Sequence, residues 1–119
     1  MEQEKIFHLT ARTDWDAACQ SGEYRADSFD EEGFIHASTK EQVLRTADRF
    51  YHGQSGLVLL EIEAAKVIAE IRYEDLSGEG MLFPHIYGPL NVDAVSGWAV
   101  FDPQADGSFC FPKQFQAVI

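Results

Sequence analysis

The sequence has little positive charge and no long hydrophobic run, and both shortages limit what the protein can do. Nine Lys and Arg residues stand against 20 Asp and Glu residues, a formal net charge of −11 at pH 7. Nucleic acids and anionic membrane surfaces attract basic proteins, so this balance argues against general binding to either. No apolar stretch approaches the roughly 20 residues that span a bilayer. The first residues are too acidic for a signal peptide, and we expect a cytoplasmic protein.

Cysteines and closely spaced histidines are also scarce. The two cysteines, Cys19 and Cys110, form no Cys-x-x-Cys pair, which excludes a zinc knuckle and a thioredoxin-type motif. The four histidines include no His-x-His or His-x₃-His pair, so we expect no metal site, although three histidines are enough for an open zinc site. The acidic balance leaves room for one small anionic ligand held at a local group of hydrogen-bond donors.

Three of the four histidines recur in one local pattern of histidine, apolar residue and hydroxyl residue. In a strand, residues i and i+2 point to the same face, so each segment can present an imidazole beside a hydroxyl. Imidazole can serve as acid, base or hydrogen-bond partner near neutral pH. The pattern therefore predicts candidate catalytic and ligand-binding groups, which are His8 with Thr10, His36 with Ser38, and His85 with Tyr87.

Hydrophobic periodicity predicts strands over residues 5–9, 33–37, 56–63, 68–73, 83–90, 95–101 and 109–111. The strand over 56–63 is apolar enough to be central. The prolines at 84 and 89 place 83–90 at a sheet edge or along an opening. Residues 24–30 are expected to be irregular, 64–66 a short helical turn, and 77–80 a loop.

Two helices are predicted. The first is capped by Thr13 and ends near residues 21–22. The second is the clearest in the chain, because Ser38 with Glu41, or Thr39 with Gln42, can form a capping box. It is expected to end at residues 52–53 and to bury one stripe of side chains, namely Val43, Leu44, Ala47, Phe50 and Tyr51. A chain of 119 residues then fits one domain, 1–119, of α+β class, with helices packed on a mixed or antiparallel sheet.

The strand that carries His36 leads directly into the second helix. Free backbone N–H groups at a helix N-terminus bind anions, so Ser38, Thr39 and Lys40 can hold a phosphate beside His36. The alternative is that Ser38 and Thr39 only cap the helix and His36 is a buried structural residue. His8 has the same two interpretations.

The stretch 83–90 holds His85 and Tyr87 between two prolines and a glycine. These residues restrict the backbone, which suits a rigid wall of a binding site. The alternative is an edge strand that ends in a tight turn.

Together, residues 6–10, Trp15, 33–38 with Gln42, 57–62 and 83–90 resemble the bacterial and plant family called domain of unknown function 952. The resemblance extends over nearly the whole chain, with a family-like core at 4–112. That family is similar in fold to the ADP-ribosyltransferases and the RNA 2′-phosphotransferases. The resemblance implies a bent, split β-sheet with flanking helices and a cleft that holds NAD in relatives.

The resemblance also implies roles for residues. His8 is expected to contact the ribose on the nicotinamide side, and His36 to line the nicotinamide pocket. Active transferases often carry Glu at a third position, but the strand around His85 has no acid, and Glu79 and Asp93 lie outside the motif. This departure argues against protein ADP-ribosylation and leaves a phosphotransferase-like activity, processing of an NAD derivative, or binding without turnover.

The expected ligand is NAD, ADP-ribose or a related phosphorylated nucleotide. His8 and Thr10 are expected at the ribose, and His36 and Ser38 at the phosphate or the pocket wall. Thr39 is expected to assist at the phosphate, and His85 and Tyr87 to form the opposite wall.

Two alternatives stay open. One is a module that binds a ligand or a protein without catalysis. The oligomeric state stays open as well. The other is a two-histidine phosphoesterase, in which His8/Thr10 and His36/Ser38 would open a cyclic phosphate by acid–base catalysis. Only 28 residues separate those two histidines, too few for the two lobes of that family.

Overall fold

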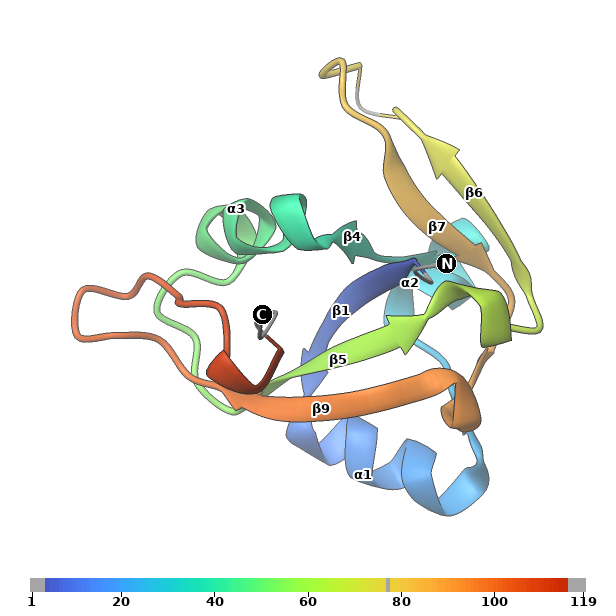
Figure 1. The fold of residues 1–119 in the computed structure, drawn as a ribbon, viewed down its shortest axis with the longest axis horizontal. Coiled ribbons are helices and arrows are strands. Elements are labelled where there is room, and N and C mark those ends of the chain that lie inside the picture. The colour runs from blue at the N-terminus through green and yellow to red at the C-terminus, as the bar shows by residue number, and fades with distance from the viewer. Residues whose placement is uncertain (1–3, 77, 116–119) are drawn as a thin grey trace.

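The computed structural model describes residues 4–76 and 78–115, and its centre is an antiparallel four-stranded sheet. The order in this sheet is β4 (Ser38–Thr39), β1 (Lys5–Ala11), β5 (Leu57–Glu63) and β9 (Val95–Phe101) (Figure 1). β5 pairs with β1 on one side and with β9 on the other, which confirms the predicted central strand.

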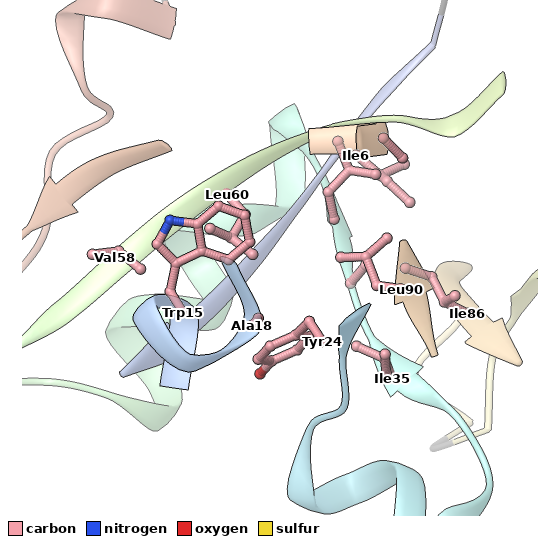
Figure 2. Packing of buried hydrophobic residues seen from close by; sticks show 12 residues of the cluster. Ile6, Trp15, Ala18, Tyr24, Ile35, Val58, Leu60, Ile86 and Leu90 are labelled. Atoms are coloured by element: carbon pink, nitrogen blue, oxygen red, sulfur yellow. The ribbon is translucent and has the colours of Figure 1, made fainter. Parts of the chain in front are cut away.

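Both faces of this sheet are covered by apolar side chains. On one face, Trp15 and Ala18 of helix α1 (Arg12–Ser21) pack on Val58 and Leu60 of β5 (Figure 2). On the other face, helix α3 (Lys40–Phe50) and the C-terminal segment pack on alternate residues of the same strands, such as Phe7. A strand covered on both faces has few polar positions, which explains why β5 is almost continuously apolar.

A second, three-stranded sheet has the order β3 (Ile35–His36), β7 (Phe83–Tyr87) and β6 (Glu70–Glu74). The β6–β7 hairpin extends away from the central sheet (Figure 1). One face of this second sheet contributes Ile35 and Ile86 to the core around α1. Side chains alternate along a strand, so the other face carries His36 and His85.

Of the two positions predicted for the proline-flanked strand, the sheet edge is wrong, because β7 is the middle strand of its sheet. Its residues Phe83 and His85 do line an opening, which is the cavity between α3 and the second sheet. Pro84 is tolerated in this middle strand for a geometric reason. In an antiparallel sheet the N–H and C=O of one residue point to the same neighbour, and the carbonyl of Pro84 accepts a hydrogen bond from Ala37 N–H at 3.0 Å. The N–H that Pro84 lacks would therefore have faced the chain beyond the end of β3, not β6.

Other short elements also differ from the predictions. Helix α1 begins at Arg12 with Ala11 as N-cap, not at Thr13, because β1 runs directly into the helix. Residues expected to be irregular form strand β2 (Glu23–Tyr24), paired with β8 (Leu90–Asn91), and helix α2 (Asp27–Glu32). Elements of two to six residues are too short to show a hydrophobic period.

The structure confirms most of what the sequence predicts for helix α3. Thr39 is the N-cap and forms a capping box with Gln42, and Val43 and Ala47 are buried. The assignment of Phe50 to the buried stripe was wrong, since its side chain is 66% exposed.

Short 3₁₀ helices complete the chain, namely η1 (Ala64–Lys66), η2 (Val92–Ala94) and η3 (Lys113–Phe115). The strand expected at 109–111 is absent from the described chain; these residues are irregular, with Phe109 and Phe111 packed into the core beneath α3.

The molecule is therefore a small α+β domain with a split antiparallel sheet, and every strand pairing within the described residues is antiparallel. Among residues 4–76 and 78–115 there is no helix of the length and apolar character needed to cross a bilayer.

Candidate functional site: a cavity between helix α3 and the second sheet

A cavity of about 390 Å³ lies where α3, β1 and the second sheet meet. Its polar lining comes from segments far apart in the sequence: Glu32, His36, Ser38, Arg45, Thr46, Arg49, Glu74, Glu79 and His85. His8 also contributes to the lining, and apolar side chains from α3 and the β6–β7 hairpin complete it.

His36 and His85 are direct cross-strand partners in the β3–β7 pair. Paired residues of antiparallel strands lie side by side on one face. Their ring centroids are 5.4 Å apart, with the rings almost perpendicular at 85°. Two of the three predicted catalytic histidines are thus adjacent in space, although 49 positions separate them in the sequence.

His85 is held by an acidic partner on the neighbouring strand. Its Nδ1–H donates to Oε1 of Glu74 at 2.9 Å, and the Tyr87 hydroxyl donates to the same oxygen at 2.6 Å. The hydrogen bond from Tyr87, and next that from His85, hold the pKa of Glu74 below its usual value, so the carboxylate is ionised at neutral pH. The same bond to Glu74 raises the pKa of Tyr87.

His36 has an acidic partner as well. Its Nε2–H donates to Oε1 of Glu32 at 3.1 Å, and its side chain is half exposed at the cavity edge. Phe34 packs against both histidines, stacked on His85 at 4.3 Å and edge-on to His36 at 4.8 Å between ring centroids. Each imidazole therefore directs one nitrogen to a carboxylate, and the described residues supply no hydrogen-bond partner to the other nitrogen.

His8 plays a different part, because both of its ring nitrogens are engaged. Nδ1–H donates to the backbone carbonyl of His36, and Nε2 lies 2.8 Å from the Tyr24 hydroxyl, which is 2.9 Å from Thr10 Oγ1. Burial lowers the pKa of His8 to about 4, so the ring is neutral at pH 7. Direct contact of His8 and Thr10 with a ribose is not supported by this geometry, and His8 instead positions the backbone of His36.

Charged groups in the cavity are mostly paired. Arg49 binds Glu79 at 2.7 Å, while Glu32 and Glu74 are held by the two histidines. Arg45 is exposed and lines the cavity, and within residues 4–76 and 78–115 it has no ion-pair or hydrogen-bond partner. Arg45 is the positive charge that remains available to a ligand.

At the start of α3, several groups expected at an anion site have partners within the protein. Thr39 and Gln42 use their polar groups in the capping box, where Thr39 N–H donates to Gln42 Oε1 at 3.0 Å. Lys40 lies over the ring of Phe111, outside the cavity. Of the predicted ligand-binding hydroxyls, Ser38 lines the cavity, whereas Thr10, Thr39 and Tyr87 do not, and Tyr87 contributes only through Glu74.

Sequence reasoning missed the groups that complete this site. Glu32 lies four residues before His36, but α2 ends at Glu32 and His36 is in β3, so no helical spacing predicts this pair. Glu74 reaches His85 because β6 pairs with β7, and no local sequence pattern predicts that pairing. No group of three or more potential metal ligands gathers in the part of the chain that the structure describes.

Comparisons with known proteins agree with this architecture. No curated protein matches the chain. The crystal structure of protein CC0527 from Caulobacter crescentus is 37% identical, covers 89% of this chain and 93% of that chain, and superposes with a TM-score of 0.81. Its solution NMR structure is 38% identical, covers 87% of this chain and 90% of that chain, and gives a TM-score of 0.77.

The profile of a family described as a protein of unknown function, DUF952, matches residues 9–98. That match extends over more than half of the chain, and the chain belongs to the DUF952 family.

Proposed function

We propose that the cavity binds a phosphorylated nucleotide of the class that includes NAD and ADP-ribose. The observation that carries this proposal is the position of Arg45, a guanidinium without a protein partner among the described residues, on the wall of a cavity that also holds His36 and His85. Arginine is the side chain best suited to bidentate hydrogen bonds with phosphate oxygens.

The charge distribution supports an anionic ligand despite the acidic chain. The three carboxylates of the lining, Glu32, Glu74 and Glu79, each lie within hydrogen-bond distance of a basic side chain. Arg49 offsets the charge of Glu79, and the carboxylates of Glu32 and Glu74 accept hydrogen bonds from His36 and His85, which leaves Arg45 and the second imidazole nitrogens to contact a ligand. A local donor site of this kind can bind one anion in a protein whose net charge is −11.

The apolar part of the lining suits a nucleobase or a nicotinamide ring. Phe50, Leu76, Met81 and Phe83 come from α3 and the β6–β7 hairpin and form a wall beside the polar groups. Phe50 and Leu76 are 66% and 63% exposed. Ligand sites are mainly apolar, with a few polar groups that fix orientation, and this cavity has that composition.

We also propose that the fold is related to that of the ADP-ribosyltransferases and the RNA 2′-phosphotransferases, with changed roles for the predicted residues. His36 and His85 would contact the ligand, His8 would position His36, and Glu74 would supply the cleft carboxylate that the strand around His85 lacks. The split sheet and the position of Glu74 in the cavity lining support this proposal.

A second candidate is a protein-docking module without catalysis. The observation in its favour is a set of large exposed apolar side chains: Phe50 and Leu76, which line the cavity, and Leu82, which lies in the chain between the lining residues Met81 and Phe83. Exposed apolar groups that lie together mark interaction surfaces. A nucleotide-binding site and a docking module differ in one property, since only the former binds free nucleotide.

Arg45→Gln is expected to weaken ADP-ribose binding by roughly 10- to 100-fold, because the substitution removes charge-assisted hydrogen bonds to the phosphate groups. Isothermal titration calorimetry with ADP-ribose and with NAD measures this directly. Arg12→Gln is the matched control, because Arg12 is exposed, lies over Trp98 and does not line the cavity. Absence of binding by the wild type, or equal losses in the two variants, would contradict the proposal.

A further inference from the structure

We infer that His85 and His36 act as general base and general acid in the hydrolysis of a nucleoside 2′,3′-cyclic phosphate. The inference rests on the proposed function, because it places the phosphate of a bound nucleotide in the same cavity. The proposed function requires only that the cavity binds a nucleotide, whereas this inference also assigns it a hydrolysis reaction.

The first argument is the orientation of the two rings. Glu74 accepts the Nδ1–H of His85, which places the lone pair of the neutral ring on Nε2. Glu32 accepts the Nε2–H of His36, which leaves Nδ1 as the second functional nitrogen of that ring. A carboxylate that fixes one nitrogen of an imidazole so that the other can transfer a proton is the arrangement of many acid–base catalysts.

The second argument is the distance between the rings. Their centroids are 5.4 Å apart, close enough for both imidazoles to reach oxygens of one phosphate group. The backbone of His36 is fixed by the hydrogen bond from His8, and the ring of Phe34 packs against both imidazoles. Rigid support of this kind keeps reactive groups in productive geometry.

The difference in exposure of the two histidines assigns their roles. His85 is 4% exposed and held by an ionised carboxylate, so its Nε2 is suited to removing a proton from a water molecule inside the cavity. His36 is half exposed. It can donate its proton to a leaving oxygen and take up another from solvent after each turnover.

The reaction balances with these groups alone. Water loses a proton to Nε2 of His85 and its oxygen attacks phosphorus, so a new P–O bond forms. The bond between phosphorus and the ribose 2′ oxygen breaks, and that oxygen receives a proton from Nδ1 of His36. The product is a nucleoside 3′-phosphate, and Arg45 offsets the negative charge that builds up on the phosphoryl oxygens.

The size of the cavity and the net charge of the chain favour a mononucleotide over an RNA chain as substrate. The cavity has a volume of about 390 Å³ and lies between α3 and the β6–β7 hairpin. A polynucleotide needs a basic groove along its backbone, whereas this chain carries a net charge of −11. The substrate class is therefore a small cyclic nucleotide.

The test is hydrolysis of adenosine 2′,3′-cyclic phosphate by the full chain, with the product followed by phosphorus NMR. His85→Gln and His36→Gln are each expected to lower kcat by about 100-fold or more, the range for loss of an acid–base group. His52→Gln is the matched control and is expected to hydrolyse as the wild type does, since His52 is exposed and outside the cavity lining. Because His36 is exposed, its variant is expected to fold even if the His85 variant does not.

Three outcomes would overturn the inference. If the wild type binds ADP-ribose but leaves the cyclic phosphate intact, the catalytic inference is wrong and the proposed function stands. If it neither binds nor hydrolyses nucleotides, both are wrong. If hydrolysis persists unchanged in His36→Gln, the activity does not come from this pair of histidines.

Discussion

The free energy of unfolding is expected to fall by about 3 kcal/mol between pH 7 and pH 4 because of His8 alone. In the folded protein, burial lowers the pKa of His8 from its ordinary value of 6.5 to about 4. As the pH drops below 6.5, the unfolded chain binds a proton that the folded protein does not, so stability decreases. The decrease ends near pH 4, where the folded protein binds that proton too. Urea denaturation at a series of pH values measures the slope.

A control distinguishes the pH dependence of stability caused by His8 from that caused by the carboxylates. Glu63, Glu70, Glu74 and Asp106 have lowered pKa values, and their contributions to stability are lost only at more acidic pH. Between pH 6.5 and pH 5 the slope is expected to disappear in His8→Gln and to remain in His52→Gln. An unchanged slope in His8→Gln would mean that His8 is not buried as a neutral ring.

Phe34→Ala is expected to lower the free energy of unfolding by about 3–5 kcal/mol, as for other buried phenylalanines. Phe34 is 4% exposed and its ring contacts His36, His85 and Tyr87. Because Phe34 lines the cavity, removal of its ring enlarges the cavity and takes away the support of both imidazoles. The loss is a large share of the stability of a small domain. Chemical denaturation of the purified variant gives the value.

Phe50→Ala provides the comparison, because it removes the same ring from the opposite wall of the cavity. With its side chain 66% exposed, Phe50 is expected to change stability by no more than about 0.5 kcal/mol. Similar stability losses in the two variants would show that Phe34 is not a structural support of the site.

The longer elements of this fold are predictable from the sequence, and the short ones are not. The central strand β5 and helix α3 were found because each has a sustained apolar pattern, and for α3 a capping box. Strand β3 has two residues, and they pair with residues of β7 that are 51 and 49 positions away in the sequence. Pairing of that kind depends on the whole chain, so the prolines, the local signal in this strand, predicted an edge for β7 that the structure does not have.

For the same reason, only part of the candidate site could be predicted from the sequence. His36, His85 and Ser38 were chosen from a repeated local pattern, and the structure places all three on the cavity. The same pattern also selected His8 and Thr10, whose polar groups are satisfied by Tyr24 from β2. A local pattern shows which side chains share a face but not what that face packs against.

Titration of histidine-labelled protein with ADP-ribose, followed by NMR of the imidazole rings, tests the central claim most directly. The four histidines serve as reporters within one molecule, since His36 and His85 lie together on the cavity while His52 lies outside its lining. Binding in the cavity predicts saturable changes in the signals of His36 and His85 and none in that of His52. Unchanged signals of His36 and His85 at saturating ADP-ribose would contradict the claim that this cavity is a nucleotide site.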